Sequence, residues 1–303
     1  IPCKDGGAAP APAEITEAIV VEVDPVVEVT APPEEPAVVA TPVVTEAPTV
    51  FQTLSVTTNP VLFPSRPSFV SAGNFPPFAD GEGRGLMTDF VVAALRHSNF
   101  PRINNINPVS LPFDPLMAST DPDVLLSFPW VNPGCAETDF LSERSLNLCK
   151  NYTFSDKAYE IVLTFLVADR GGLAQAVRAD QFNGKRICVP EQYPVNHLAE
   201  AGFFEPAVTI ERGNSVAECI GRLLSGQTDV VNADYLSVEA TYAVLSSQSI
   251  IVENTEFTWV RSVHAIAHNE NQAGMQTLTA FNFGLIALRQ SGEWLSISQK
   301  YLN

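Results

Sequence analysis

The chain has 303 residues and a formal net charge of −17, with 34 acidic side chains against 17 Lys and Arg. The positive charges form no cluster, which argues against nucleic acid and anionic membrane surfaces as partners. No apolar run reaches the roughly 18 residues needed to cross a bilayer, so we expect no transmembrane segment. The length suffices for one large domain or for two lobes with a sizeable core.

Residues 1–50 differ in composition from the rest of the chain. They hold nine of the 24 prolines, no aromatic residue, and nine acidic side chains against one Lys. Such a sequence is typical of an extended acidic, Pro-rich tail without a core of its own. Two β-branched runs, 19–23 and 26–29, could instead add as strands to the edge of a sheet, which would make the segment a docking arm. Both interpretations stay open.

The first α/β unit runs from Val70 to Leu95. A short strand at 68–72 enters a Phe-Pro-Pro-Phe turn and a Gly-rich loop, and we expect a helix to begin near Thr88 as its N-cap. This order leaves backbone N–H groups at the carboxyl end of the strand, where a small polar or anionic ligand could bind. The alternative is a loop that merely joins strand to helix.

Strand-like and helix-like stretches continue to alternate along the chain. We expect strands at 108–111, 123–128, 161–168, 186–189, 208–211, 228–233, 249–253 and 263–267, and helices at 215–224, 238–245, 275–290 and 293–301. The strands at 123–128 and 161–168 are continuously apolar, which is typical of buried strands in a parallel or mixed sheet. The pattern predicts an α/β fold.

The five cysteines show no close CxxC pairing, and no His is spaced with them as in a metal site. Cys135 and Cys149 flank a loop rich in Pro, Gly, Asn and Ser, which favours a disulfide across that loop. Cys188 and Cys219 are either a second disulfide or two small buried apolar residues. Because the sequence starts with Ile rather than Met, we expect that an export signal has been removed.

Six motifs in the same order resemble the solute-binding proteins of amino-acid-type ABC importers, the type II periplasmic binding proteins. The motifs are the Phe-Pro-Pro-Phe loop at 75–78, the helix start at 85–90, the run from Ser142 through Phe154 to Tyr159, the Asn-Gly-Lys-Arg turn at 183–186, the stretch 223–231 and the two closing helices. No single motif is specific, but together they span residues 67–303.

The resemblance implies a two-lobed α/β fold with two hinge-crossing strands and a ligand between the lobes, which close around it. It places lobe 1 at 55–166 plus 260–303 and lobe 2 at 167–259, preceded by the tail at 1–50. It also implies a periplasmic location and a membrane-associated transporter as partner.

The resemblance further implies a set of ligand-binding residues. Arg144 would form a bidentate pair with the ligand's carboxylate. Asp234 would bind the ligand's ammonium group, and Phe75, with Phe78, would form an aromatic wall. Two simpler roles are open: Arg144 as a surface residue paired with an acidic neighbour, and Asp234 as an N-cap.

Two stretches depart from the family's pattern. Phe128 and Trp130 stand where importers have small polar residues, and they would narrow a polar pocket or line one for an apolar or aromatic ligand. The sequence Pro-Glu-Gln-Tyr-Pro at 190–194 replaces the usual Gly-Thr/Ser helix start. Its prolines remove backbone donors, and Glu191 adds a negative charge. Both departures count against an α-amino acid as the ligand.

The sequence therefore predicts an exported protein that binds a small organic solute between two lobes, for transport or sensing. The alternative is a binding-protein fold with a degenerate pocket that binds no solute. Such a protein would be a structural or accessory subunit of a periplasmic assembly, docked through residues 1–50. Some enzymes resemble this fold, but no nucleophile or catalytic carboxylate can be singled out. We predict no enzyme activity, catalytic residue, metal or cofactor.

Overall fold

The computed structural model describes most of the chain beyond the tail. The described residues are 63–100, 106–109, 120–136, 138–168, 172–245 and 251–302. All of them belong to one compact unit, Thr58–Asn303. The predicted tail at 1–50 lies outside the described residues.

Nine strands within the described residues form one mixed sheet. They are β1 (Ser68–Ala72), β2 (Ile106–Val109), β3 (Val124–Val131), β4 (Tyr152–Phe154), β5 (Tyr159–Ala168), β6 (Arg186–Pro190), β7 (Thr209–Gly213), β8 (Val230–Asp234) and β9 (Ile251–His268). The helices are α1 (Leu86–His97), α3 (Glu143–Asn151), α4 (Asn196–Glu200), α5 (Val216–Leu224), α6 (Tyr235–Leu245), α7 (Gln272–Gln290) and α8 (Glu293–Tyr301), with short 3-10 helices at Leu173–Gln175 and Ala179–Phe182.

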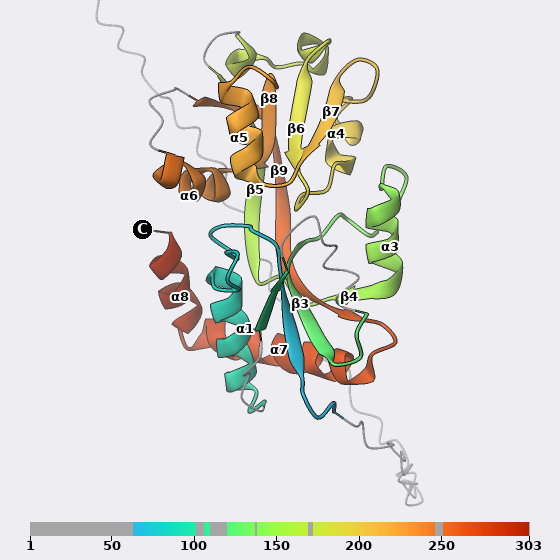
Figure 1. Ribbon diagram of the computed structural model, residues 1–303, viewed down its shortest axis with the longest axis vertical. Coiled ribbons are helices and arrows are strands. Elements are labelled where there is room, and N and C mark those ends of the chain that lie inside the picture. The colour runs from blue at the N-terminus through green and yellow to red at the C-terminus, as the bar shows by residue number, and fades with distance from the viewer. Residues whose placement is uncertain are drawn as a thin grey trace, which may run out of the picture. The chain divides into compact units, whose positions relative to one another are not determined.

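The sheet consists of two parallel groups joined by an antiparallel pair. Strand order is β2-β1-β3-β9-β5-β8-β6-β7, with β4 added on β9. β1 runs parallel to β2 and β3, and β6 runs parallel to β7 and β8. The long strands β5 and β9 pair with each other between these groups and cross from one to the other (Figure 1). This is the predicted two-lobed fold with two hinge-crossing strands.

We call the group around β1–β3, with β4, α1, α3, α7 and α8, lobe 1. The group around β6–β8, with α4, α5 and α6, is lobe 2. The residue boundaries expected for the lobes stay a prediction, because both long strands belong to one continuous sheet.

The core of lobe 1 is closed by its C-terminal helices. Trp294 of α8 stacks on Phe90 of α1 at a ring distance of 5.5 Å and on Tyr159 of β5 at 5.6 Å. α7 packs so closely on α1 that a Cβ on Gly284 would lie 1.8 Å from the carbonyl oxygen of Ala94. Glycine is therefore required at this contact.

An aromatic cluster fills the core of lobe 2. Phe165, Phe182, Phe203 and Phe257 pack at ring distances between 5.0 and 5.8 Å. Such edge-to-face and tilted contacts add to the stabilisation that apolar burial provides.

The prediction of two separate strands at 249–253 and 263–267 is wrong, because β9 runs unbroken from Ile251 to His268; residues 249 and 250 lie outside the described residues. The pairing with β5 shifts register between Thr164 and Phe165. At this bulge the Oδ1 atom of Asn254 accepts hydrogen bonds from the N–H groups of Glu256 and Phe257, at 3.0 and 3.2 Å, and its Nδ2 donates to carbonyl oxygens of the 3-10 segment at 173–176. These bonds hold a polar stretch within the strand.

The expected helix start at Thr88 is also wrong. α1 begins at Leu86 with Gly85 as its N-cap, and the Thr88 hydroxyl instead donates to the carbonyl oxygen of Gly83 at 2.8 Å. A Cβ on Gly85, whose φ is +142°, would lie 2.5 Å from the carbonyl oxygen of Phe78. The close approach of the loop to the Pro-Pro turn thus starts the helix earlier than the side-chain pattern indicates.

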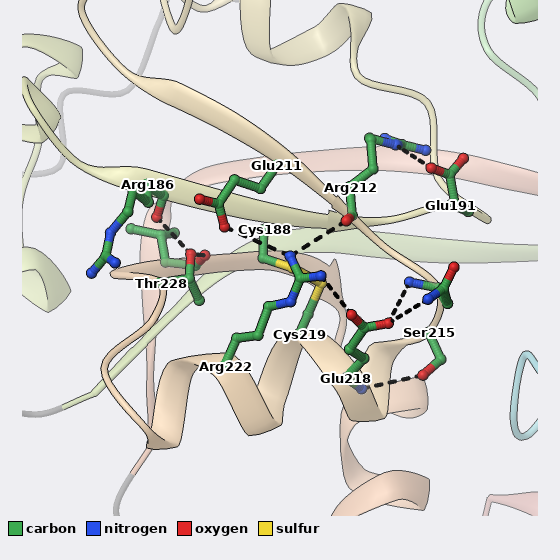
Figure 2. The surroundings of a disulfide bond; sticks show 12 residues. Arg186, Cys188, Glu191, Glu211, Arg212, Ser215, Glu218, Cys219, Arg222 and Thr228 are labelled. Carbon is green, nitrogen blue, oxygen red and sulfur yellow. Dashed lines mark hydrogen bonds and ion pairs between the residues drawn. A yellow bond between two sulfur atoms is a disulfide. The ribbon is translucent and has the colours of Figure 1, made fainter.

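Both predicted disulfides are present. Cys135 bonds to Cys149, which links the loop after β3 to α3, and Cys188 bonds to Cys219, which links β6 to α5 (Figure 2). A Cβ on Gly213 would lie 2.6 Å from the Cys219 sulfur, so the end of β7 packs directly on the second bridge. Among the described helices, none has the length and apolar character that a membrane span requires.

Candidate ligand site between the lobes

Arg144 lies in the first turn of α3, which Ser142 caps by accepting a hydrogen bond from the Ser145 N–H. Its Nη1 atom donates to Oε2 of Glu191 at 2.9 Å. Glu191 follows β6 in lobe 2, so this ion pair crosses from one lobe to the other. From the sequence we expected the Glu191 carboxylate to repel a ligand's carboxylate. In the structure Glu191 instead pairs with Arg144, the residue expected to bind that ligand carboxylate.

Arg212 supplies a second cation at Glu191. It lies near the end of β7, and its Nε is 3.4 Å from Oε1 of Glu191, as Figure 2 shows. Its Nη2 donates to the carbonyl oxygen of Tyr193 at 2.9 Å. Burial lowers the pKa of the Arg212 guanidinium, against the opposing effect of the Glu191 carboxylate. The Glu191 carboxylate therefore lies between two guanidinium groups.

Asp234 ends β8 and is buried. Its Oδ2 accepts a hydrogen bond from the hydroxyl of Tyr193, and its Oδ1 accepts one from the Ser237 N–H at 3.0 Å. Burial raises the pKa of the Asp234 carboxyl, while the hydrogen bonds from Ser237 and Tyr193 lower it. Asp234 is therefore the N-cap of α6, one of the two roles predicted for it. Its other carboxylate oxygen accepts the hydrogen bond from the Tyr193 hydroxyl.

The segment from Glu191 to Tyr193 contacts lobe 1 at two further points. Nε2 of Gln192 donates to the carbonyl oxygen of Asn74 at 3.0 Å. The ring of Tyr193 packs edge-on against Phe75, with centroids 5.2 Å apart. Side chains of the protein itself therefore connect the two lobes through one short segment of lobe 2.

Two neighbouring cavities remain beside this segment. The smaller, of about 30 Å³, is lined by Trp130, Arg144, Glu191 and Gln192 among others. The larger, of about 260 Å³, shares these four residues and also reaches Arg212. A cavity of this size can hold a small organic molecule beside the two guanidinium groups.

The four predicted aromatic residues lie in different environments. Phe75, Phe78 and Phe128 are buried in the core and do not line either cavity. Trp130 lines both cavities, and its Nε1 donates to the Ser127 hydroxyl at 2.9 Å. Trp130 is thus the aromatic side chain of this set that a bound solute would contact.

Sequence reasoning missed the roles of Arg212 and Tyr193. A signal for Arg212 existed: it directly follows the predicted strand at 208–211, and parallel strands end at the same edge of a sheet. This places it beside the 190–194 stretch, as the pairing of Val189 with Arg212 confirms. No sequence pattern indicated that the Tyr193 hydroxyl would bind Asp234.

No family model matches the sequence, and the search of curated proteins found no match. Among solved structures, the substrate-binding protein of an amino acid ABC transporter shares 18% identity over 78% of this chain and 98% of its own, with a TM-score of 0.58. The GluR0 ligand-binding core from Nostoc punctiforme, in complex with L-glutamate, shares 16% over 78% and 99%, with a TM-score of 0.57. A histidine kinase sensor domain with similarity to periplasmic binding proteins shares 13% over 78% and 96%, with a TM-score of 0.59.

At these identities the likeness establishes the fold alone, and it agrees with the resemblance found in the sequence. The described part of the chain has the two-lobed fold of the type II periplasmic binding proteins.

Proposed function

We propose that the protein is an exported, periplasmic binding protein that takes a small organic anion between its lobes, for transport or sensing. The observation that carries this proposal is the ion pair between Arg144 of lobe 1 and Glu191 of lobe 2, with Arg212 beside it. Guanidinium groups match the two oxygens of a carboxylate. The protein's own Glu191 carboxylate occupies the position that a ligand's carboxylate would take.

A ligand anion therefore competes with Glu191. The attached carboxylate acts as a competitor at an effective concentration on the order of millimolar, which lowers the apparent affinity for an external anion. A ligand that displaces Glu191 gains the two guanidinium groups and the contact with Trp130. Such a ligand shifts the equilibrium between two arrangements of the lobes only to the extent that it binds one arrangement more tightly than the other.

The site favours a carboxylate without an ammonium group. Asp234, the residue expected to bind an ammonium, is buried beneath Tyr193 and is not among the residues lining the two cavities. The same burial leaves it no contact with a solute as an acid or base, so we propose no catalytic role for it. Trp130 in the cavity wall favours a ligand with an apolar or aromatic part.

The fold supports a general binding role, because solved structures that share it include a transporter's substrate-binding protein, a ligand-binding core and a sensor domain. A membrane-associated transporter or sensor is the partner class that follows. The accessory-subunit alternative depends on residues 1–50, which lie outside the described residues, and nothing in the comparisons favours it.

The test is thermal unfolding with two matched solutes, 3-phenylpropanoate and L-phenylalanine, which differ only in the ammonium group. We expect 3-phenylpropanoate to raise the melting temperature by mass action. The shift should increase in Glu191→Gln, which removes the competing charge, and disappear in Arg144→Ala. Arg178→Ala, which removes an exposed ion pair with Asp180 and alters no residue lining either cavity, is the control. A larger shift with L-phenylalanine would contradict the proposed ligand class, and no shift in Glu191→Gln would contradict the site.

A further inference from the structure

A separate cavity of about 340 Å³ lies beside the long strands where the lobes meet. Its walls come from the loop after β3 in lobe 1, from α4 in lobe 2, and from the neighbouring residues Glu160 of β5 and Arg261 of β9. Among their lining residues, this cavity and the 260 Å³ cavity share only Pro133. The groups that it presents are therefore different from those around Arg144.

Asn196 of α4, which lines this cavity, carries an acceptor that none of the described residues uses. Its side chain is buried, and its Nδ2 donates to Oε1 of Glu200 at 2.9 Å. That bond fixes the orientation of the amide, because a carboxylate accepts only from the NH₂ group. The Oδ1 atom is buried and has no hydrogen-bond partner among the described residues. A buried acceptor of this kind requires a donor.

Arg261 brings an unused donor to the same cavity. Its Nη1 donates to the carbonyl oxygen of Val260 at 3.0 Å, while its Nε is buried without a partner among the described residues. Burial lowers the pKa of this guanidinium, and the Glu200 carboxylate opposes that effect. A partly desolvated guanidinium with a free N–H is suited to bind a carboxylate.

Two carboxylates complete the set of charged groups. Glu200 and Glu160 both line the cavity. Glu160 also pairs with Lys157 at 2.9 Å, so Glu200 is the acidic group with the larger share of its charge available to a ligand. The cavity thus combines a cation for a carboxylate with an acceptor and an anion for an N–H donor.

We propose that this cavity is a second ligand site, which takes a small zwitterion such as an amino acid or a dipeptide. The ligand's carboxylate binds Arg261, and its ammonium or amide N–H groups bind Oδ1 of Asn196 and the Glu200 carboxylate. Because the walls come from both lobes and both long strands, a ligand here favours the lobe arrangement in which these groups converge. It thereby changes the affinity of the cleft at Arg144 by thermodynamic coupling.

An ordered water molecule is the competing explanation for the two unpaired atoms, since a polar cavity of this size holds water readily. Water satisfies Asn196 and Arg261 without selecting a solute. The two explanations differ in whether a zwitterion binds and in which residues it needs.

The experiment is titration calorimetry of the full chain with glycylglycine, N-acetylglycine and glycinamide. The second probe lacks the ammonium group and the third lacks the carboxylate. We expect saturable one-to-one binding of glycylglycine and at least roughly tenfold weaker binding of the other two. Asn196→Leu and Arg261→Gln should each weaken glycylglycine binding by a similar factor. Arg261→Lys, which keeps the charge but loses Nε, should give an intermediate loss.

Arg144→Ala separates this proposal from the first one: through the coupling it should change the affinity for glycylglycine by clearly less than Asn196→Leu and Arg261→Gln do, without abolishing saturable binding. Circular dichroism melting of each variant checks that it folds. Three results would each overturn the second site: no saturable binding at millimolar glycylglycine, binding that is unchanged in Asn196→Leu and Arg261→Gln, or binding that is lost in Arg144→Ala.

Discussion

Glu191 and Tyr193 stand two residues apart in the same segment, yet their polar contacts differ in kind. Glu191 is 27% exposed and lies between guanidinium groups that are about one-third exposed. Tyr193 and its partner Asp234 are each only 1% exposed. Ion pairs that stay partly exposed to water contribute little to stability, whereas buried polar pairs are costly to break. The proposed function requires Glu191 to give way to a ligand, whereas the buried Tyr193 stabilises the fold.

The largest expected effect is at Tyr193. Tyr193→Ala removes a buried aromatic ring packed on Phe75 and leaves the Asp234 carboxyl without its hydroxyl donor. We expect the free energy of unfolding to fall by about 3–5 kcal/mol, as for other buried aromatic residues. Urea denaturation measures this, with Tyr235→Ala as the control, because Tyr235 is 53% exposed. Equal losses in the two variants would remove the distinction between the exposed and buried contacts.

The pH dependence of stability sharpens the same comparison. Burial raises the pKa of Asp234 above 3.8, so the folded protein holds this proton to higher pH than the unfolded chain does. Ionisation of Asp234 then destabilises the fold, and its contribution to the free energy of unfolding falls as pH rises from 3.8 through the folded pKa. Denaturation across this range should show that the stability of Asp234→Asn relative to the wild type increases with pH.

Asp229, which directly precedes β8, is the control, because its effect on stability should change with pH in the opposite direction. Burial alone would raise its pKa, but hydrogen bonds from the Arg186 side chain and backbone lower it overall. Its stabilising contribution is therefore present above 3.8 and is lost as pH falls through the folded pKa. The stability of Asp229→Asn relative to the wild type should thus decrease with pH. Curves of the same sign for the two variants would contradict the assignment of Asp234 as buried and Asp229 as ion-paired.

The smallest effect on stability is expected at Glu191. Glu191→Gln removes a partly exposed charge pair, so the free energy of unfolding should change by less than about 1 kcal/mol. Anion affinity should nevertheless rise, because Arg144 and Arg212 lose their internal competitor. Melting curves with and without 3-phenylpropanoate report both quantities on one sample. A large loss of stability would mean that Glu191, like Tyr193, is structural.

The sequence predicted the elements whose signals are local. The helix at 293–301 has the predicted bounds, and the helix predicted at 215–224 is α5, which begins one residue later, at Val216. The Cys135–Cys149 disulfide also followed from the composition of the loop that it spans, whereas for Cys188 and Cys219 the sequence left a disulfide and two buried apolar residues as alternatives. These features depend on neighbours in the sequence, so a single chain suffices to read them.

The rest depends on contacts between distant residues. The continuity of β9 requires Asn254 to bond with carbonyl groups near residue 175, and the start of α1 requires Gly85 to pack on Phe78. In the candidate site, the pairing of Glu191 with Arg144 joins residues 47 positions apart. The pattern of residue types along the chain does not reveal such partners. The resemblance therefore predicted the candidate ligand site, but nothing in the sequence predicted that Glu191 would pair with Arg144 there.

The stacking of Trp294 between Phe90 and Tyr159 has a consequence for the order in which the protein assembles. Ribosomes and export channels deliver a chain from its N-terminus. The strands β6, β7 and β8 emerge as one uninterrupted stretch, which the bond between Cys188 and Cys219 can secure early. Phe90, by contrast, lacks its stacking partner Trp294 until α8 has been synthesised, some two hundred residues later. Lobe 1 is thus the half whose aromatic core stays incomplete longest while the chain is being made.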